Sequence, residues 1–172
     1  MSAPGPGTTL SSEIEMQIRG LMMDPVTNMP IVVLKDVHSD RVLPIWLGIF
    51  EANAIALELE KTATPRPMTH DLLQNLARGL NADIRKVVVS ELREDTFFAV
   101  IWMEQGGETI ALDARPSDAI ALALRWDCPI YVSNTVLESS RQAANGNSTV
   151  TPEDMRRWLE NLNDDEMGRY KM

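Results

Sequence analysis

The sequence has one cysteine, no run of basic residues and no long apolar segment, and each absence excludes a class of protein. With Cys128 alone, no disulfide can form within the chain, which favours the reducing cytoplasm. No stretch approaches the roughly 20 consecutive apolar residues of a membrane-spanning helix, so we expect no membrane contact. The net charge of −9 argues against passive nucleic-acid binding, which depends on Lys and Arg neutralising phosphates.

Several signatures of catalysis are missing as well. The sequence contains no P-loop, no glycine-rich dinucleotide turn, no HExxH pair and no cysteines at metal-binding spacing. Only two histidines are present, so histidine-based catalysis must use one of them. His38 lies in a predicted hairpin turn, where we expect a solvated side chain. His70 begins a predicted helix and is the better candidate.

What is present suits one globular domain, because 172 residues with 44% hydrophobic content can bury a single core. The Pro-, Gly- and Ser-rich segment 1–12 predicts a flexible leader. Residues 13–142 form the predicted domain, and 143–172 form a linker and a C-terminal helix. That helix is expected at about 151–161, after a Thr-Pro-Glu-Asp start.

Hydrophobic periodicity predicts an α+β fold. Alternating segments predict strands at 13–20, 30–37, 41–47, 83–93, 96–103, 108–113 and 129–132, whereas three- and four-residue spacing predicts helices at 50–61, 69–80, 116–126 and 136–144. Short turns imply a mostly antiparallel sheet, a hairpin plus a meander, packed with three main helices and followed by a helical C-terminal tail. Thr69 is the expected N-cap of the second helix, with Leu72, Leu73, Leu76 and Leu80 as its core stripe.

The segment Asp113–Asp118 lies where a strand ends and a helix begins, and it allows two interpretations. In the first, Asp113 accepts backbone amides in a turn, and Ser117 or Asp118 serves the helix N-terminus. In the second, Asp113 and Asp118 converge on a Mg²⁺ or Mn²⁺ ion and Arg115 binds a phosphate. The sequence leaves both open.

Three further polar residues lie near helix starts. Glu51 is favoured by the helix dipole, but it could also complete an acidic cluster. His70 could donate protons or bind metal, whereas Asp71 has a simple explanation as an acid at the positive end of a helix. As neighbours on a helix, these two side chains diverge and do not pair with each other.

Four segments carry a resemblance to a known family: RGL at 19–21, LPIWLGIFEANAIA at 43–56, RPMTHDLL at 66–73 and LDARPSDAIALALR at 112–125. In this order they resemble the bifunctional nuclease (BFN) domain family over roughly residues 13–142. The resemblance implies an α+β fold and self-association. It also implies nuclease activity, since some plant members are described as degrading both RNA and DNA.

The working hypothesis from the sequence is therefore a metal-dependent phosphodiesterase acting on nucleic acid with little sequence preference. The expected catalytic residues are His70, Asp71, Asp113 and Asp118. The expected metal ligands for Mg²⁺ or Mn²⁺ are Asp113, Asp118 and Glu51, and the expected substrate-binding residues are Arg66, Arg115 and Ser117. A homo-oligomer is expected, with a dimer favoured. The alternative is a non-enzymatic oligomeric module that binds a small ligand or a protein partner.

Overall fold

The structure, a computed structural model, describes residues 12–147, with side chains as far as residue 142. The leader expected over 1–12, apart from Ser12, and the helix expected at 151–161 lie outside the described residues. The strands are β1 (Glu13–Met23), β2 (Pro30–Asp36), β3 (Val42–Trp46), β4 (Ala82–Arg93), β5 (Thr96–Gln105), β6 (Glu108–Ala114) and β7 (Ile130–Ser133). The helices are α1 (Ile49–Leu59), α2 (Thr69–Gly79), α3 (Pro116–Trp126) and α4 (Asn134–Asn147).

The described strands form one seven-stranded sheet in the order β3-β2-β1-β7-β4-β5-β6. The strands β1, β2 and β3 pair antiparallel, as do β4, β5 and β6. The short strand β7 joins the two groups, because it pairs antiparallel with β1 and parallel with β4. The expected α+β fold with a mostly antiparallel sheet is confirmed.

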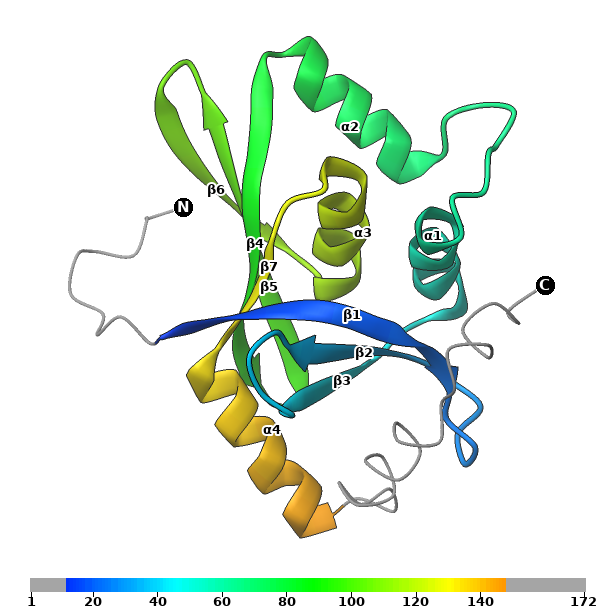
Figure 1. Cartoon of the computed structure of the whole chain (residues 1–172), viewed down its shortest axis with the longest axis vertical. Helices are drawn as coiled ribbons and strands as arrows, with labels where there is room; N and C mark the ends of the chain where they lie inside the picture. The colour runs from blue at the N-terminus through cyan, green and yellow to red at the C-terminus, as the bar shows by residue number, and fades with distance from the viewer. Residues whose placement is uncertain (1–11, 148–172) are drawn as a thin grey trace.

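Helices α1, α2 and α3 lie together beside the sheet, and α4 extends from the end of β7 (Figure 1). Helix α3 packs against β4, β5, α1 and α2, and it is the most deeply buried of these helices. Ala119, Ala121 and Ala123 are small, which lets its backbone approach the sheet closely, and Ile120 is fully buried. Because two strands and two helices pack against α3, the polar side chains at its N-terminus are held in defined positions.

The strand period decides which side chains face these helices. Along β5, Ala99, Ile101 and Met103 are buried in the main core, which they share with α3. The alternate residues Val100 and Trp102 point to the opposite face, since successive strand residues face opposite sides. Residues paired with them on β6 share that opposite face.

Helix α2 has the expected position in the chain, but the expected core stripe is wrong. Leu72, Leu76 and Leu80 are 61%, 57% and 58% exposed, and Leu73 is also exposed. Periodicity identifies an apolar face on a helix but not what covers it. Helix α2 lies at the edge of the molecule and buries none of its residues completely.

Two local expectations also need correction. Met68, not Thr69, is the N-cap of α2, and its backbone amide donates to Asp71 Oδ2 at 2.8 Å. The helix expected at 136–144 is longer, because α4 runs from Asn134 to Asn147. Val136 and Leu137 of α4 are buried in the main core, which explains why this helix forms.

Candidate functional site

Each of the helices α1, α2 and α3 carries an acidic residue at its third position. These residues are Glu51, Asp71 and Asp118. A carboxylate in the first turn is favoured by the positive end of the helix dipole, so each acid has a local structural reason. The structure adds that all three bind an arginine side chain.

Asp118 is the centre of a group of four side chains. Its Oδ1 atom lies 2.9 Å from Nε2 of His70, and its two oxygens accept from Nε and Nη2 of Arg115 at 2.7 and 3.2 Å. Nη1 of Arg115 donates to Oε1 of Glu51 at 2.8 Å. We call Glu51, His70, Arg115 and Asp118 the site network. It joins the N-terminal ends of α1, α2 and α3.

Mutual ion pairing fixes the charges of this network. Burial raises the pKa of Asp118, but hydrogen bonds from Arg115 and His70 outweigh it, so the net shift is downward. The pKa of Glu51 is lowered by a hydrogen bond from its own backbone amide and by Arg115. The pKa of Arg115 is raised by Asp118 and Glu51. Both carboxylates and the guanidinium are therefore ionised near neutral pH.

The contact with Asp118 also decides which nitrogen of His70 carries the proton. An ionised carboxylate only accepts hydrogen bonds, so Nε2 must donate. In the neutral ring this leaves Nδ1 with its lone pair, and Nδ1 makes no hydrogen bond with the described residues. The His70 side chain is only 12% exposed, so its ring is held firmly. The pair thus presents an oriented imidazole with one nitrogen able to accept a proton.

Asp71 has a different set of partners. Its Oδ1 accepts from Nε of Arg125 at 2.7 Å, and its Oδ2 accepts from the amide of Met68. The pKa of Asp71 is lowered, first by the bond from Arg125 and then by the amide of Met68. Both oxygens are therefore engaged in holding α2, and no contact joins Asp71 to Asp118 among the described residues.

Asp113 lies apart from the site network. It pairs with Val100 across β5 and β6, so it shares the sheet face opposite α3 with Trp102 and Val100. The side chain of Asp113 is exposed and makes no hydrogen bond or ion pair with the described residues. The register of β6 therefore separates Asp113 from Asp118, although only four residues lie between them in the chain.

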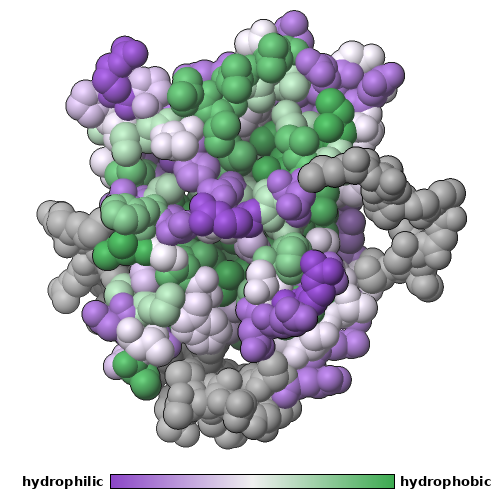
Figure 2. Space-filling model, turned by 180° about the vertical axis from the view of Figure 1, so that it is seen from behind, coloured by the Kyte–Doolittle hydropathy of each residue, from purple (hydrophilic) through white to green (hydrophobic). Residues whose placement is uncertain are grey.

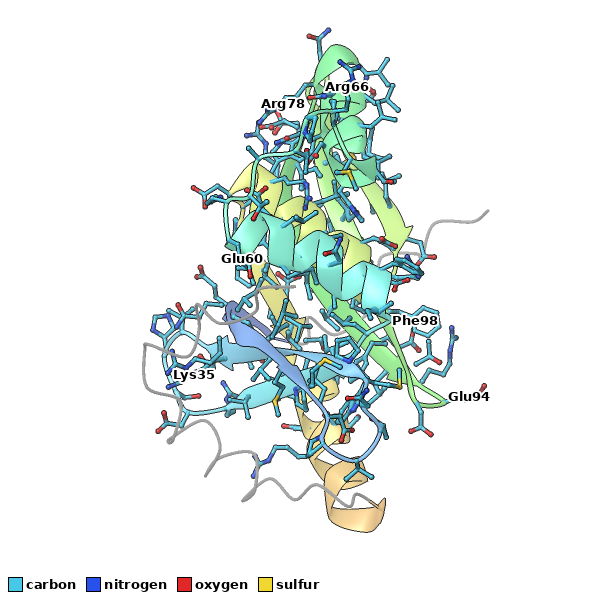
Figure 3. All side chains as sticks on the ribbon, turned by 90° about the vertical axis from the view of Figure 1, so that its right-hand side faces the viewer. Lys35, Glu60, Arg66, Arg78, Glu94 and Phe98 are labelled. Carbon is cyan, nitrogen blue, oxygen red and sulfur yellow. The ribbon has the colours of Figure 1, made fainter. Side chains whose placement is uncertain are left out.

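The three expected substrate-binding residues, Arg66, Arg115 and Ser117, do not lie together at one site. Arg115 belongs to the site network, and Ser117 is buried in the first turn of α3. Arg66 is exposed in the loop between α1 and α2 and forms no ion pair with the described residues. Figure 3 shows Arg66 and Arg78 at the same end of the molecule.

A pocket of about 280 Å³ opens beside the site network. Its lining includes Glu51, Arg115, Ser117, Asp95, Thr96 and Phe97. Arg115 therefore both binds the carboxylates of Asp118 and Glu51 and lines the pocket. His70 and Asp118 are not among the residues that line the pocket.

The expected metal ligands do not form a ligand set in this arrangement. Within the part of the chain that the structure describes, no three His, Cys, Asp or Glu side chains are grouped as a metal ion would need. Glu51 and Asp118 do converge, but both bind Arg115, whose positive charge stands between them. A divalent cation would have to replace that guanidinium.

Sequence reasoning assigned no role to Arg125, which binds Asp71 beside the site network. The side chain is 4% exposed, and it follows Ala121 by one helical turn on the buried face of α3. In the sequence, Arg125 is a charged residue at a position that the helical period assigns to the buried face of an apolar helix. This signal could have identified it, since buried charges almost always bind an opposite charge or a hydrogen-bond partner.

Comparison with known proteins identifies the family of this chain. The family model for the bifunctional nuclease domain matches residues 32–145. An uncharacterised protein of Mycobacterium tuberculosis is 41% identical over 123 residues, covering 72% of this chain and 73% of its own. Bifunctional nuclease 1 of Oryza sativa subsp. indica is 27% identical over 118 residues, 67% of this chain. Bifunctional nuclease 1 of Arabidopsis thaliana is 26% identical over 108 residues, 60% of this chain.

The match spans 36% of the rice protein and 33% of the Arabidopsis protein, so both plant relatives have long segments outside it. None of the described helices is long and apolar enough to span a membrane. The segments that carry the site network, from the start of α1 to the end of α3, all lie within the matched residues. The chain belongs to the bifunctional nuclease domain family.

Proposed function

We propose that this protein hydrolyses phosphodiester bonds of RNA or DNA with little sequence preference. The supporting observation is the contact of Asp118 with both His70 and Arg115, which places a candidate acid–base next to a candidate phosphate ligand. Family membership supports the same reaction class, since two plant relatives are named bifunctional nucleases.

Arg115 is suited to hold the phosphate. A guanidinium has five N–H donors, and the site network uses three of them. The two remaining donors are free to bind phosphate oxygens, and 64% of the side chain is exposed. Because the adjoining carboxylates repel a phosphodiester, we expect weak binding of the substrate and no preference for particular bases.

His70 is suited to move the proton. Its Nδ1 atom accepts a proton from water while the water oxygen attacks phosphorus, and the bond to the leaving-group oxygen then breaks. The departing oxygen takes up a proton from solvent water, and the imidazolium of His70 then returns its proton to solvent, so protons balance over the reaction. Asp118 keeps the ring oriented and stabilises the imidazolium that forms, as a carboxylate does beside a catalytic histidine.

Dependence on Mg²⁺ or Mn²⁺ remains a proposal from the sequence. Such an ion would supply charge stabilisation to the phosphate, but Glu51 and Asp118 could bind it only after releasing Arg115. No step of the proposed reaction is assigned to it. Assays with Mg²⁺, with Mn²⁺ and with EDTA decide the matter, because a reaction carried by His70 and Arg115 alone would survive chelation.

The test of the function is cleavage of labelled single- and double-stranded RNA and DNA by purified protein. Wild type should cleave, whereas His70→Gln should lose most of its activity. Asp40→Asn serves as the matched control, since Asp40 is 89% exposed in the turn between β2 and β3. Equal cleavage by wild type and His70→Gln would indicate a contaminating nuclease and favour the alternative of a non-enzymatic binding module.

We also propose that the protein forms a dimer through an apolar row made of Leu72 and Leu76 on α2 and Leu80 at its C-cap. These leucines recur every fourth residue, and no described element covers them. Apolar surface gathers at the upper end of the molecule when it is viewed from behind (Figure 2). A row at this spacing packs against the same row of a second copy about a two-fold axis, so the surface is self-complementary.

A further inference from the structure

We infer that Arg125 is a positioning residue that fixes α1, α2 and α3 relative to one another, so that Glu51, His70 and Asp118 meet. Each of these three helices carries one acid or base of the site network. The inference rests on the proposed function in one respect: the residues that Arg125 positions are the proposed catalytic ones.

The contacts of Arg125 reach all three helices. Its Nε atom donates to Asp71 of α2 at 2.7 Å, and Nη1 and Nη2 donate to the carbonyl of Ala54 in α1 at 3.3 and 3.2 Å. Within α3, Nη1 also donates to the carbonyl of Ala121 at 2.9 Å. In return, the carbonyl of Arg125 accepts from Nε2 of Gln74 on α2 at 2.7 Å.

Helix α2 depends on these polar contacts more than the other helices do. It buries no residue completely, and its leucines face outward. Apolar contacts resist sliding weakly because they have no direction, whereas hydrogen bonds fix both distance and angle. The pair Arg125–Asp71, together with the bond from Gln74 to the carbonyl of Arg125, therefore helps to orient α2 on α3.

The geometry links this pair directly to the site. Asp71 follows His70 in the first turn of α2, so any shift of Asp71 moves His70 with it. The His70–Asp118 contact is 2.9 Å long, and a displacement of about 1 Å would end it as a hydrogen bond. Loss of Arg125 should thus release the imidazole from Asp118 without removing either residue.

Nuclear magnetic resonance tests this on the folded protein, without need of turnover. The chain has only two histidines, so the ¹⁵N signals of the His70 ring are readily assigned and His38 is an internal reference. We compare wild type with Arg125→Met and Arg125→Lys. Arg93→Met is the matched control, because Arg93 is 59% exposed on the sheet.

In wild type, the ring shifts should report a proton fixed on Nε2. In Arg125→Met they should approach those of an exchanging pair of tautomers, with His38 unchanged, and Arg125→Lys should restore part of the wild-type pattern. Where cleavage is measurable, kcat should fall roughly 10- to 100-fold in Arg125→Met while KM changes little. The Arg93→Met control should match wild type in both measurements.

A folded Arg125→Met protein with wild-type His70 signals would overturn the inference. Should Arg125→Met fail to fold, Asp71→Asn replaces it, because it weakens one contact and keeps those to Ala54 and Ala121. Unchanged His70 signals in folded Asp71→Asn would count equally against the inference. Absence of nuclease activity in wild type would refute the proposed function alone, since the ring signals report positioning independently.

Discussion

Nε2 of His70 lies 2.9 Å from Oδ1 of Asp118, although 48 positions separate the two residues in the chain. The contact exists because the N-terminal ends of α2 and α3 meet on one side of the sheet. Each residue has an ordinary explanation at the start of its helix, and the contact brings the two together as the proposed acid–base pair.

Replacement of Asp118 by Asn should lower kcat by about 10²- to 10⁴-fold, the range expected when general acid–base catalysis is lost. The amide keeps the shape of the carboxylate but removes the charge that holds Arg115 and stabilises a protonated His70. Initial cleavage rates measure the effect, with Asp40→Asn in parallel. A variant as active as wild type would show that Asp118 has only a structural role.

Asp113→Asn should reduce cleavage far less than Asp118→Asn. The register of β6 turns Asp113 toward the sheet face opposite α3, where it contacts neither Asp118 nor Glu51. Rates of both variants should be measured over a range of Mg²⁺ and Mn²⁺ concentrations. Equal losses, with the same shift in metal dependence, would support the shared ion that the sequence predicted and would contradict the separation seen here.

Gly48→Ala should impair cleavage activity in the same way as Glu51→Gln. A Cβ atom on Gly48 would overlap the Glu51 carboxylate, so that flexible side chain must move away from Arg115. The φ of Gly48 is −73°, which alanine adopts readily, so folding stability should change by less than about 1 kcal/mol. Activity and thermal unfolding should be compared for both variants. Normal activity in Gly48→Ala with impaired Glu51→Gln would show that Glu51 reaches Arg115 by another path.

Stability should fall as the pH drops from about 4 to 2. Hydrogen bonds from the Trp46 indole and nearby amides lower the pKa of Asp24 to about 2. Burial raises the pKa of Asp36, but Ser39, the amide of His38 and Arg41 bring it to about 2. A carboxyl group whose pKa is lower in the folded state stabilises the folded protein at pH values above its ordinary pKa of 3.8. This stabilisation disappears as the pH approaches 2.

Asp24→Asn should remove one such contribution. Its free energy of unfolding should depend less on pH than that of wild type, by on the order of 1–2 kcal/mol between pH 7 and 2.5. Urea unfolding at the two pH values measures this difference. Asp40→Asn should follow wild type, and an identical pH dependence in Asp24→Asn would contradict the assignment.

Leu76→Asp should convert the proposed dimer into a monomer that remains folded. Leu76 is 57% exposed in the single chain, so the substitution should hardly disturb the core, but it would bury a charge in the dimer contact. Light scattering after size exclusion measures the mass. Val26→Asp, at another exposed apolar position, is the control. A monomeric wild type, or a Leu76→Asp dimer, would reject this surface.

The sequence by itself determined the elements and the fold class. Strand alternation, helical spacing and short turns are local properties, and they place every described strand and helix within a few residues of its actual bounds. They could not decide which way α2 faces, because an apolar stripe looks the same whether the core or another protein covers it. The exposure of Leu72, Leu76 and Leu80 is therefore a finding of the tertiary structure.

For the candidate site too, the sequence identified some features and only the tertiary structure decided the others. Residue types and helix starts singled out Glu51, His70 and Asp118 from the sequence, because acids at these positions and a rare histidine are visible locally. Their meeting depends on the packing of three helices, and Arg125 acquires its role only through contacts with Ala54 and Asp71 from distant segments. Proximity along the chain allowed Asp113 and Asp118 to share one ion, but the pleat of β6 turns Asp113 away.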